Sequence, residues 1–216
     1  MVRDERRIPD ATVGRLPVYL RILVDLGDRQ EATVSSDRLA ALAGVNAAKV
    51  RKDLSHLGTY GTRGVGYEVA YLLFKIRQAL GLEDDSPLVV VGAGNLGRAL
   101  VNYGGFGDRG FPVAAILDDS PDKIGSRVGE LVVRPVADLA AIVEALHPVM
   151  GVIATPATAA QQVADRLVGV GITAILNFAP TLVSVPTSTV VRQVDLALEI
   201  QVLSFYQRQL QGGVDE

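Results

Sequence analysis

The stretch VVVGAGNLGRAL, residues 89–100, decides the fold of the larger part of this chain. An apolar run ends at Val91, and Gly92, Gly94 and Gly97 then complete a G-x-G-x-x-G motif before a helical pattern begins. The first glycine permits the turn, the second lets the backbone approach a pyrophosphate, and the third lets the helix pack on the strand. Amide N–H groups at the helix start then face the phosphates. Glycine-rich turns are common, but a strand before and a helix after this one favour a dinucleotide site.

A second apolar strand is predicted over residues 113–117, and Asp118 and Asp119 follow it. Asp118 comes 21 residues after Gly97, close to the spacing of about 20 that is typical of a carboxylate on the adenosine ribose. Such a carboxylate accepts from the 2′-OH and repels a 2′-phosphate, so we expect NAD(H) rather than NADP(H). The alternative interpretation of an acid at this place is a turn residue or a helix cap.

The alternation of helices and strands continues to the end of the sheet. Helices are predicted over 136–146 and 157–168, and strands over 149–154, 172–178 and 190–194. Successive strands separated by helices indicate an α/β Rossmann fold with a doubly wound, mostly parallel sheet. Because ligands bind at the carboxyl ends of such strands, four residues are candidates for the nicotinamide end of the site: Thr155, Pro156, Asn177 and Ala179.

The N-terminal part of the chain carries a pattern of short helices. A first helix is expected over 16–26, and Ser35 and Ser36 are candidate caps of a second one. Gly44 suits the left-handed position that ends this second helix. Asn46 is a candidate cap of a third helix, which runs to about residue 57.

The third helix separates an apolar face from a polar one. At 100° per residue Ala47, Val50, Leu54 and Leu57 share one arc, which predicts a buried stripe. The opposite arc carries Lys49, Arg51, Lys52, Ser55 and His56, with Asp53 at its edge. A capped helix, a tight turn and a basic second helix form a helix-turn-helix pattern, whose second helix enters the major groove of DNA. The alternative is an ordinary solvated helix face.

The segment GTYGTRGVGY, residues 58–67, predicts a tight hairpin with Arg63 near its tip. A helix-turn-helix followed by a hairpin is a winged helix, and an arginine on the wing can reach phosphate or a narrow minor groove. A further apolar-striped helix is expected over 68–80. The residues expected to bind DNA are Ser35, Ser36, Asn46, Lys49, Arg51, Lys52, Ser55, His56 and Arg63.

Charge also divides the chain. Residues 1–80 carry a net charge of +4 and residues 81–216 one of −7, which gives −3 in total. The basic N-terminal half favours an anionic partner. We therefore expect a winged-helix domain over 1–80, a linker over 81–87 (GLEDDSP), a dinucleotide-binding domain over 88–194 and a C-terminal helix with a tail over 195–216.

Several classes of protein are disfavoured by composition. The chain has no cysteine, so it has neither disulfides nor cysteine metal sites, and no metal site is expected. No secretory signal is visible, and no apolar run approaches the roughly 20 residues that a membrane span needs. We expect a cytoplasmic protein without a membrane partner.

The residues that a dehydrogenase needs are not evident. Hydride transfer to a carbonyl usually needs a proton donor, often His, Lys or Tyr. His56 lies on the basic helix, His147 follows a helix end, and Lys123 is expected on the adenosine side. No catalytic residue is assigned, and the dinucleotide is interpreted as a signal. The alternatives are a small NAD-dependent oxidoreductase with an accessory N-terminal domain, and a cofactor-free winged-helix regulator whose α/β half only dimerises.

The segment from Asp195 to Tyr206 predicts a helix that is apolar on more than one face. Such a helix is buried between layers or between subunits. Helix-turn-helix proteins usually dimerise on palindromic sites, which favours an intersubunit role. The alternative is a terminal helix packed on its own sheet.

With these motifs in view, the sequence closely resembles the bacterial redox-sensing transcriptional repressors of the Rex family. The resemblance covers nearly the whole chain after about residue 14. Its matching stretches are RLPVYLRIL (15–23), VSSDRLAALAGVNAAKVRKDLSHLGTYGTRGVGYEV (34–69), VVVGAGNLGRALVNYGGF (89–106), PDKIG (121–125), GITAILNFAP (171–180) and VRQVDLALEIQVLSFY (191–206). The family often has Tyr-Phe where this chain has His56 and Leu57.

The resemblance implies a homodimer that binds a palindromic operator in double-stranded DNA when NADH is low and leaves it when NADH binds. It implies that NADH and NAD⁺ are regulatory ligands and that the C-terminal helix is exchanged between protomers. It also implies switch roles for Arg21, Tyr103 and Asp195, with Tyr103 near the nicotinamide. The residues expected to bind the cofactor are then Gly92, Ala93, Gly94, Asn95, Leu96, Gly97, Tyr103, Asp118, Asp119, Lys123, Thr155, Pro156, Asn177 and Ala179.

Overall fold

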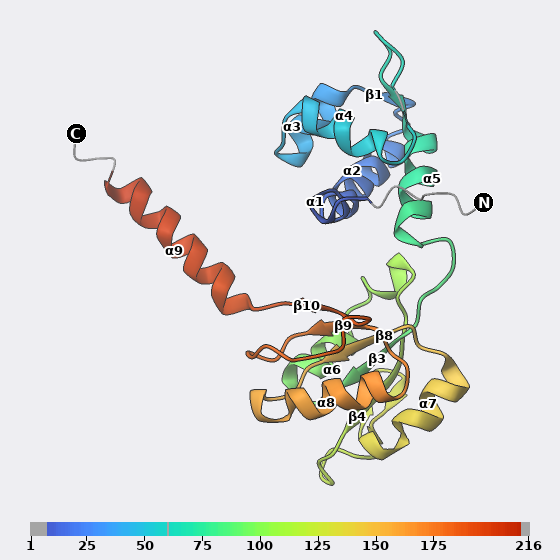
Figure 1. The fold of residues 1–216 in the computed structure, drawn as a ribbon, viewed down its shortest axis with the longest axis vertical. Coiled ribbons are helices and arrows are strands. Elements are labelled where there is room, and N and C mark those ends of the chain that lie inside the picture. Colours follow the sequence, from blue (N-terminus) through green and yellow to red (C-terminus); the bar gives the residue numbers. More distant parts are fainter. Residues whose placement is uncertain (1–7, 60, 213–216) are drawn as a thin grey trace. The chain divides into compact units, whose positions relative to one another are not determined.

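The computed structural model describes residues 8–59 and 61–212, and the chain divides into two compact units, residues 1–84 and 85–216 (Figure 1). The elements of the first unit are α1 (Asp10–Val13), α2 (Leu16–Asp28), β1 (Thr33–Val34), α3 (Ser36–Ala43), α4 (Ala47–Ser55), β2 (Tyr67–Glu68) and α5 (Val69–Leu80). Within the described ranges, no helix has both the length and the apolar character needed to cross a membrane.

The turn between α3 and α4 forms as the sequence predicts. The Ser35 side chain accepts a hydrogen bond from the Arg38 N–H at 3.1 Å, so Ser35 alone is the N-cap and Ser36 is the first residue of α3. Gly44 ends α3 in the left-handed conformation, with φ at 66°. The Asn46 side chain accepts from the Lys49 N–H at 2.8 Å and caps α4. The left-handed Gly44 that ends α3 and the Asn46 cap that begins α4 fix the geometry of the turn between them.

The wing follows α4. β1 and β2 pair antiparallel, with Val34 opposite Tyr67, and an isolated bridge joins Thr62 to Gly66. Arg63 lies between those bridge partners, at the tip as predicted, and it is exposed. The hydrophobic core of this unit is formed mainly by α2, α3, α4 and α5. Its fully buried large side chains are Leu16, Tyr19, Leu23, Leu39, Leu54, Leu72 and Ile76.

The second unit is built around a parallel sheet. Its strands are β3 (Leu88–Val91), β4 (Val113–Asp118), β7 (Arg134–Pro135), β8 (Met150–Ile153), β9 (Ala174–Asn177) and β10 (Val190–Gln193), in the order β10-β9-β8-β3-β4-β7. The other elements are α6 (Asn95–Val101), η1 (Gly107–Arg109), β5 (Arg127–Val128), β6 (Leu131–Val132), η2 (Val136–Asp138), α7 (Leu139–Leu146), α8 (Ala157–Gly169) and α9 (Leu196–Gly212).

The sheet is covered on both faces, which explains the continuous apolar runs of its central strands. Along β3, Val89 and Val91 share a core with side chains of α7 and α8. Leu88 and Val90 point to the other face, where residues of α6 and of the β5–β6 hairpin pack. The strand order reverses between β3 and β8, and this switch point is where doubly wound sheets bind ligands.

α9 extends further than the sequence predicts and ends at Gly212. Its large apolar side chains are each more than half exposed in the single chain: Leu196, Leu198, Ile200, Val202, Leu203, Phe205, Tyr206 and Leu210. A helix with this much exposed apolar surface needs a further surface to cover it.

Candidate nucleotide pocket and DNA-binding surface

A cavity of about 450 Å³ opens at the carboxyl ends of β3, β4 and β8. Nine of the residues expected to bind a cofactor line it: Gly92, Gly94, Asn95, Leu96, Asp118, Asp119, Lys123, Thr155 and Pro156. They come from segments far apart in the sequence, and the parallel strands bring them together because their carboxyl ends share one edge of the sheet.

The three glycines of the motif have different reasons to be glycine. Gly92 has φ at +112°, and an added Cβ would collide with the carbonyl oxygen of Ala154. A Cβ on Gly97 would collide with the carbonyl oxygen of Gly92, so the third glycine permits contact with the loop itself. At Gly94 an added Cβ would meet nothing within 4 Å. The chain itself therefore does not require glycine at Gly94, and the open space beside it faces the cavity.

Asp118 is fixed between the glycine loop and the cavity. Its Oδ2 accepts from the Ala93 N–H at 2.7 Å and from Lys123 Nζ at 2.9 Å, and its Oδ1 accepts from the Ser120 N–H at 2.8 Å. Burial raises the pKa of this carboxyl, but the hydrogen bonds from Lys123, Ser120 and Ala93 outweigh burial and hold the pKa below its ordinary value. The site therefore presents an ionised carboxylate at neutral pH.

The cavity also has a polar wall whose residues were not predicted from the sequence. Arg166 Nη1 lies 3.3 Å from Asp119 Oδ2, and Gln162 lines the same wall. Ala159, Gln162, Val163 and Arg166 are spaced as one face of α8, so helical periodicity carried a signal for them. The buried Oγ1 of Thr155 has no hydrogen-bond partner within the described part of the chain. This hydroxyl is available to a bound molecule.

The other five residues that were expected to bind the cofactor are not among the described residues that line the cavity. Ala93, in the loop after β3, and Gly97, in the first turn of α6, are buried behind it. Asn177 is fully buried, donates to Thr181 O at 2.8 Å and to Gln193 Oε1 at 2.7 Å, and accepts from the Ala179 N–H at 2.9 Å. Asn177 and Ala179 thus shape the loop after β9. Tyr103 is 51% exposed.

Of the residues with expected switch roles, Arg21 and Tyr103 are exposed and Asp195 is half-buried. Tyr103 packs edge-on against Phe106, with ring centroids 5.2 Å apart, and its hydroxyl accepts from Arg109 at 3.5 Å. Asp195 caps α9, where its Oδ1 accepts from the N–H groups of Ala197 at 2.9 Å and Leu198 at 3.3 Å. Arg21 is exposed on α2.

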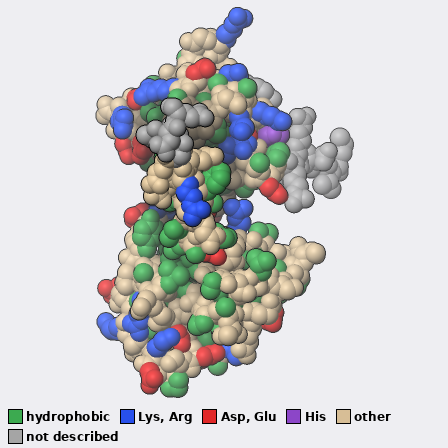
Figure 2. All heavy atoms as spheres, turned by 90° about the vertical axis from the view of Figure 1, so that its left-hand side faces the viewer, with side chains coloured by type: hydrophobic (Ala, Val, Ile, Leu, Met, Phe, Trp, Pro, Cys, Tyr) green, Lys and Arg blue, Asp and Glu red, His purple; other side chains and the backbone are tan. Residues whose placement is uncertain are grey.

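In the first unit, a groove of about 710 Å³ runs between α4 and the wing. Ser35, Ser36, Arg51, Lys52, Ser55 and Arg63 line it, together with residues 59, 61–62 and 64–67 of the wing and Asp37. Arg51 Nη1 donates to Ser36 Oγ at 3.0 Å, which aims this guanidinium along the start of α3. Figure 2 shows Lys and Arg side chains on several parts of one face of this winged-helix unit.

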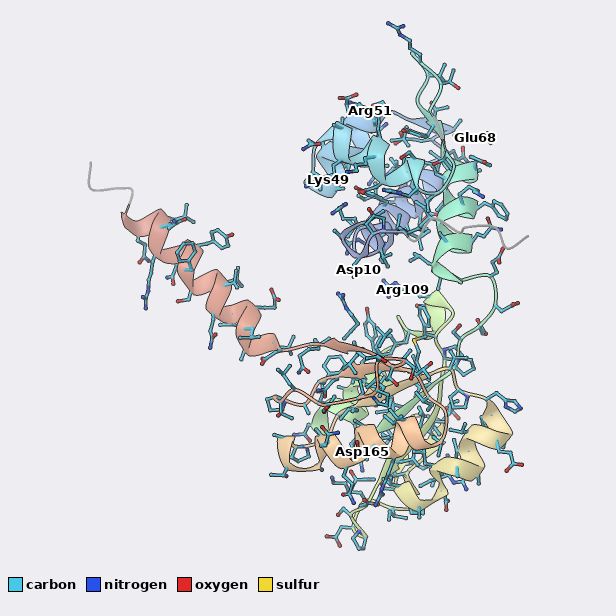
Figure 3. The ribbon with its side chains drawn as sticks, in the orientation of Figure 1. Asp10, Lys49, Arg51, Glu68, Arg109 and Asp165 are labelled. Atoms are coloured by element: carbon cyan, nitrogen blue, oxygen red, sulfur yellow. The ribbon has the colours of Figure 1, made fainter. Side chains whose placement is uncertain are left out.

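Three other candidate DNA-binding residues lie elsewhere. The Asn46 side chain caps α4. Lys49 is exposed, and it projects from a different side of α4 than Arg51 (Figure 3). His56 is the C-cap of α4 and is half-buried, with Nε2 enclosed. The structure also corrects the placement of Asp53, which is not at the edge of the exposed face but 1% exposed in the core.

The fold and the two sites define a class: a winged-helix DNA-binding unit joined to a Rossmann-like unit with a nucleotide pocket, as in ligand-responsive transcriptional regulators. Residues 7–55 match a family model described as "Putative DNA-binding protein N-terminus", and residues 83–181 match a model described as "CoA binding domain".

The curated relatives narrow this class. The redox-sensing transcriptional repressor Rex of Streptomyces avermitilis is 56% identical over 207 residues, which cover 96% of this chain and 82% of the relative. The chain belongs to the Rex family of redox-sensing transcriptional repressors. It is therefore a transcriptional regulator, as its relatives are.

Solved structures agree with this assignment. RSP in complex with β-NAD⁺ and operator DNA has a TM-score of 0.88 at 32% identity, over 94% of each chain. RSP in complex with β-NADH has a TM-score of 0.85 at 31% identity, over 97% of this chain and 99% of that chain.

Proposed function

We propose that this chain represses transcription in the cytoplasm by binding operator DNA as a homodimer when NADH is scarce, and that it leaves the operator when NADH occupies the pocket. The observation that carries the proposal is the likeness to RSP, a repressor of the same family and fold that has been solved with NAD⁺ and operator DNA and, separately, with NADH.

The pocket fits a dinucleotide. Open space beside Gly94 leaves room for a pyrophosphate against the backbone, where amide N–H groups at the start of α6 favour negative charge. Asp118 would accept from the adenosine ribose, with Lys123 and Asp119 beside it. The unpartnered hydroxyl of Thr155 and the adjacent Pro156 would lie toward the nicotinamide. Asn177 and Ala179 would shape that end of the site without lining the cavity.

The winged-helix unit fits duplex DNA. α4 would enter the major groove with Arg51 and Lys52, while Arg63 on the wing would reach phosphate or the minor groove. A palindromic operator would present two half-sites about 10 base pairs apart to the two recognition helices of a dimer. The exposed apolar surface of α9 supports a subunit interface, and we infer that α9 is exchanged between protomers.

NADH can release DNA only if it binds the DNA-incompetent arrangement more tightly, and DNA must then weaken NADH binding by the same factor. We assign the switch to Arg21, Tyr103 and Asp195. Asp195 would pair with Arg21 in the DNA-competent form and turn to Tyr103 when NADH is bound. A carboxylate that exchanges partners suits a two-state device, because each partner would stabilise a different one of the two arrangements.

The test is operator binding by the purified protein with and without NADH, using a duplex selected from a random pool by the protein itself. We expect tight binding without NADH and at least a tenfold loss with saturating NADH, within the range of allosteric coupling of about 5- to 150-fold. Sequence-specific binding that NADH, NAD⁺ and CoA all leave unchanged would point to the cofactor-free regulator instead. If CoA but not NADH releases the protein from DNA, the ligand of the pocket is CoA, which the description of the matching family model names.

A further inference from the structure

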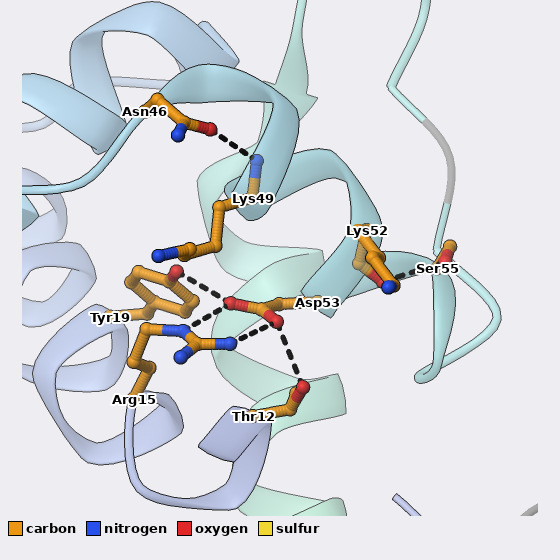
Figure 4. Close-up of polar contacts among 8 residues, drawn as sticks. All are labelled: Thr12, Arg15, Tyr19, Asn46, Lys49, Lys52, Asp53 and Ser55. Atoms are coloured by element: carbon orange, nitrogen blue, oxygen red, sulfur yellow. Dashed lines mark hydrogen bonds and ion pairs between the residues drawn. The ribbon is translucent and has the colours of Figure 1, made fainter. Parts of the chain in front are cut away.

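A buried cluster of polar side chains lies on the inner side of the recognition helix α4 (Figure 4). Asp53 Oδ2 accepts from Arg15 Nε at 2.6 Å and from Tyr19 Oη at 2.8 Å. Asp53 Oδ1 accepts from Arg15 Nη2 at 2.7 Å and from Thr12 Oγ1 at 2.8 Å. The carboxylate of Asp53 therefore connects α4 to α1 through Thr12 and to α2 through Arg15, its N-cap residue, and Tyr19.

Every member of the cluster is shielded from water to some degree. The side chain of Asp53 is 2% exposed and that of Arg15 is 25% exposed, while Tyr19 is fully buried. Burial alone would raise the pKa of Asp53, but the hydrogen bonds from Arg15, Tyr19 and Thr12 outweigh it and hold the pKa below its ordinary value. The carboxylate is thus ionised, and the bidentate arginine supplies the opposite charge.

This cluster constrains α4 in a way that its apolar contacts do not. Val50 and Leu54 pack α4 into the core, but apolar contacts have no preferred direction and tolerate small rotations. A bidentate Arg–carboxylate pair tolerates neither rotation nor sliding without losing a charged hydrogen bond. Asp53 directly follows Lys52 and is two positions from Arg51, so any rotation of α4 at Asp53 moves both basic side chains in the groove.

We propose that Asp53 is a positioning residue for DNA recognition: its hydrogen bonds to Arg15, Tyr19 and Thr12 set the rotation of α4 on α1 and α2, and so the aim of Arg51 and Lys52 at the operator. The inference rests on the proposed operator binding. It assigns a specific role to an acidic residue within the basic helix, where a carboxylate by itself would repel DNA.

The sign of a single substitution separates positioning from repulsion. If Asp53 acted only as a negative charge close to phosphate, Asp53→Asn would strengthen binding to every duplex, because repulsion would be removed. If Asp53 positions α4, the same substitution weakens binding to the operator and leaves the affinity for unrelated DNA nearly unchanged. Unrelated DNA is held by phosphate contacts, which do not require an exact aim.

The experiment measures the Kd of the full-length wild type, Asp53→Asn and Asp25→Asn for two duplexes. One duplex is selected from a random pool by the wild type, and the other has the same base composition in scrambled order. For Asp53→Asn we expect a loss of about tenfold or more on the selected duplex, comparable to one lost base contact, and a change below about threefold on the scrambled one. Asp25 is an exposed acid on α2, and its neutralisation should change neither affinity.

Circular dichroism reports whether each variant keeps its helices, and NADH binding reports whether the second unit is intact. If Asp53→Asn loses helix content, the same DNA-binding measurements are made on Tyr19→Phe, because this substitution removes one hydrogen bond to Asp53 and keeps the buried ring. A several-fold loss confined to the selected duplex supports the proposal. A folded Asp53→Asn, or in its place a folded Tyr19→Phe, that binds the selected duplex as tightly as wild type would overturn it. A wild type that enriches no sequence would instead overturn the proposed function, and this inference with it.

Discussion

At the scale of single residues, the buried carboxylate of Asp118 makes the sharpest prediction about ligand choice. Its hydrogen bonds from Ala93, Ser120 and Lys123 hold it ionised at the edge of the cavity, where it would accept from a ribose hydroxyl and repel a 2′-phosphate. We expect Asp118→Ala to weaken NADH binding by about tenfold or more and to narrow the gap between NADH and NADPH, because a charge-assisted hydrogen bond and a repulsion disappear together. Isothermal titration of both nucleotides tests this, with Asp138→Ala, on the surface at η2, as the control. Wild-type protein that binds NADPH as tightly as NADH would contradict the assignment.

Asp53 predicts a dependence of stability on pH. Its folded-state pKa is depressed, so its contribution is fully present above the unfolded-state pKa of about 3.9 and is lost as the pH falls below that value. Asp53→Asn lacks this contribution at every pH. We therefore expect the difference in Tm between wild type and Asp53→Asn to be largest near neutral pH and to shrink below about pH 4. Melts followed by circular dichroism measure it, and a difference that stays constant down to pH 2.5, roughly where most aspartates are protonated, would show that the ion pair does not stabilise the fold.

At the scale of elements, the glycine motif where β3 meets α6 contains one glycine that the fold requires and one that a ligand would require. A Cβ on Gly97 would collide with the Gly92 carbonyl, whereas a Cβ on Gly94 meets nothing within 4 Å. We expect Gly97→Ala to lower the Tm of the second unit and Gly94→Ala to fold normally but bind NADH at least about tenfold more weakly, since the methyl group fills the space left for the pyrophosphate. Melting curves and NADH titrations of the two variants distinguish these effects. If Gly94→Ala binds NADH with normal affinity, the pyrophosphate does not bind beside Gly94.

The groove beside α4 predicts how DNA affinity depends on salt. Arg51 and Lys52 both line it, and a lost phosphate contact flattens the slope of log K against log salt by about one unit. We expect an Arg51→Ala, Lys52→Ala variant to bind the operator more weakly with a flatter slope. Lys75→Ala, on α5, removes a charge outside the groove and serves as the control. Unchanged operator affinity in the double variant would exclude this face of α4 from the interface.

The same elements show how far sequence reasoning reaches. Caps and left-handed glycines are local, so Ser35 and Gly44 correctly predicted the two ends of α3, and Asn46 the start of α4. Short elements that depend on tertiary neighbours were missed: α1, the β5–β6 hairpin and the edge strand β7 are two to four residues long and lack periodicity. The burial of Asp53 depends on Arg15 and Thr12, which lie about 40 residues away. No local pattern on α4 distinguishes such an acid from one at the edge of its exposed face.

At the scale of the whole molecule, the question is how a ligand in one unit alters DNA binding by the other. The proposed exchange of partners by Asp195 is complicated by its local role, because its carboxylate caps α9. Alanine would remove the cap and the charge together. Asparagine caps helices about as well as aspartate, so Asp195→Asn removes the charge and keeps α9 capped.

We expect Asp195→Asn and Arg21→Ala each to reduce the factor by which NADH lowers operator affinity, and the double variant to be little worse than either, because the two side chains act as one pair. The measurement is operator affinity with and without saturating NADH for wild type, both single variants and the double variant, with light scattering to verify that α9 still supports the same oligomer. Because coupling is reciprocal, NADH affinity with and without operator must change by the same factor in each protein. Single variants that keep the full wild-type ratio would exclude this pair, and the signal would then have to pass between the units through other residues.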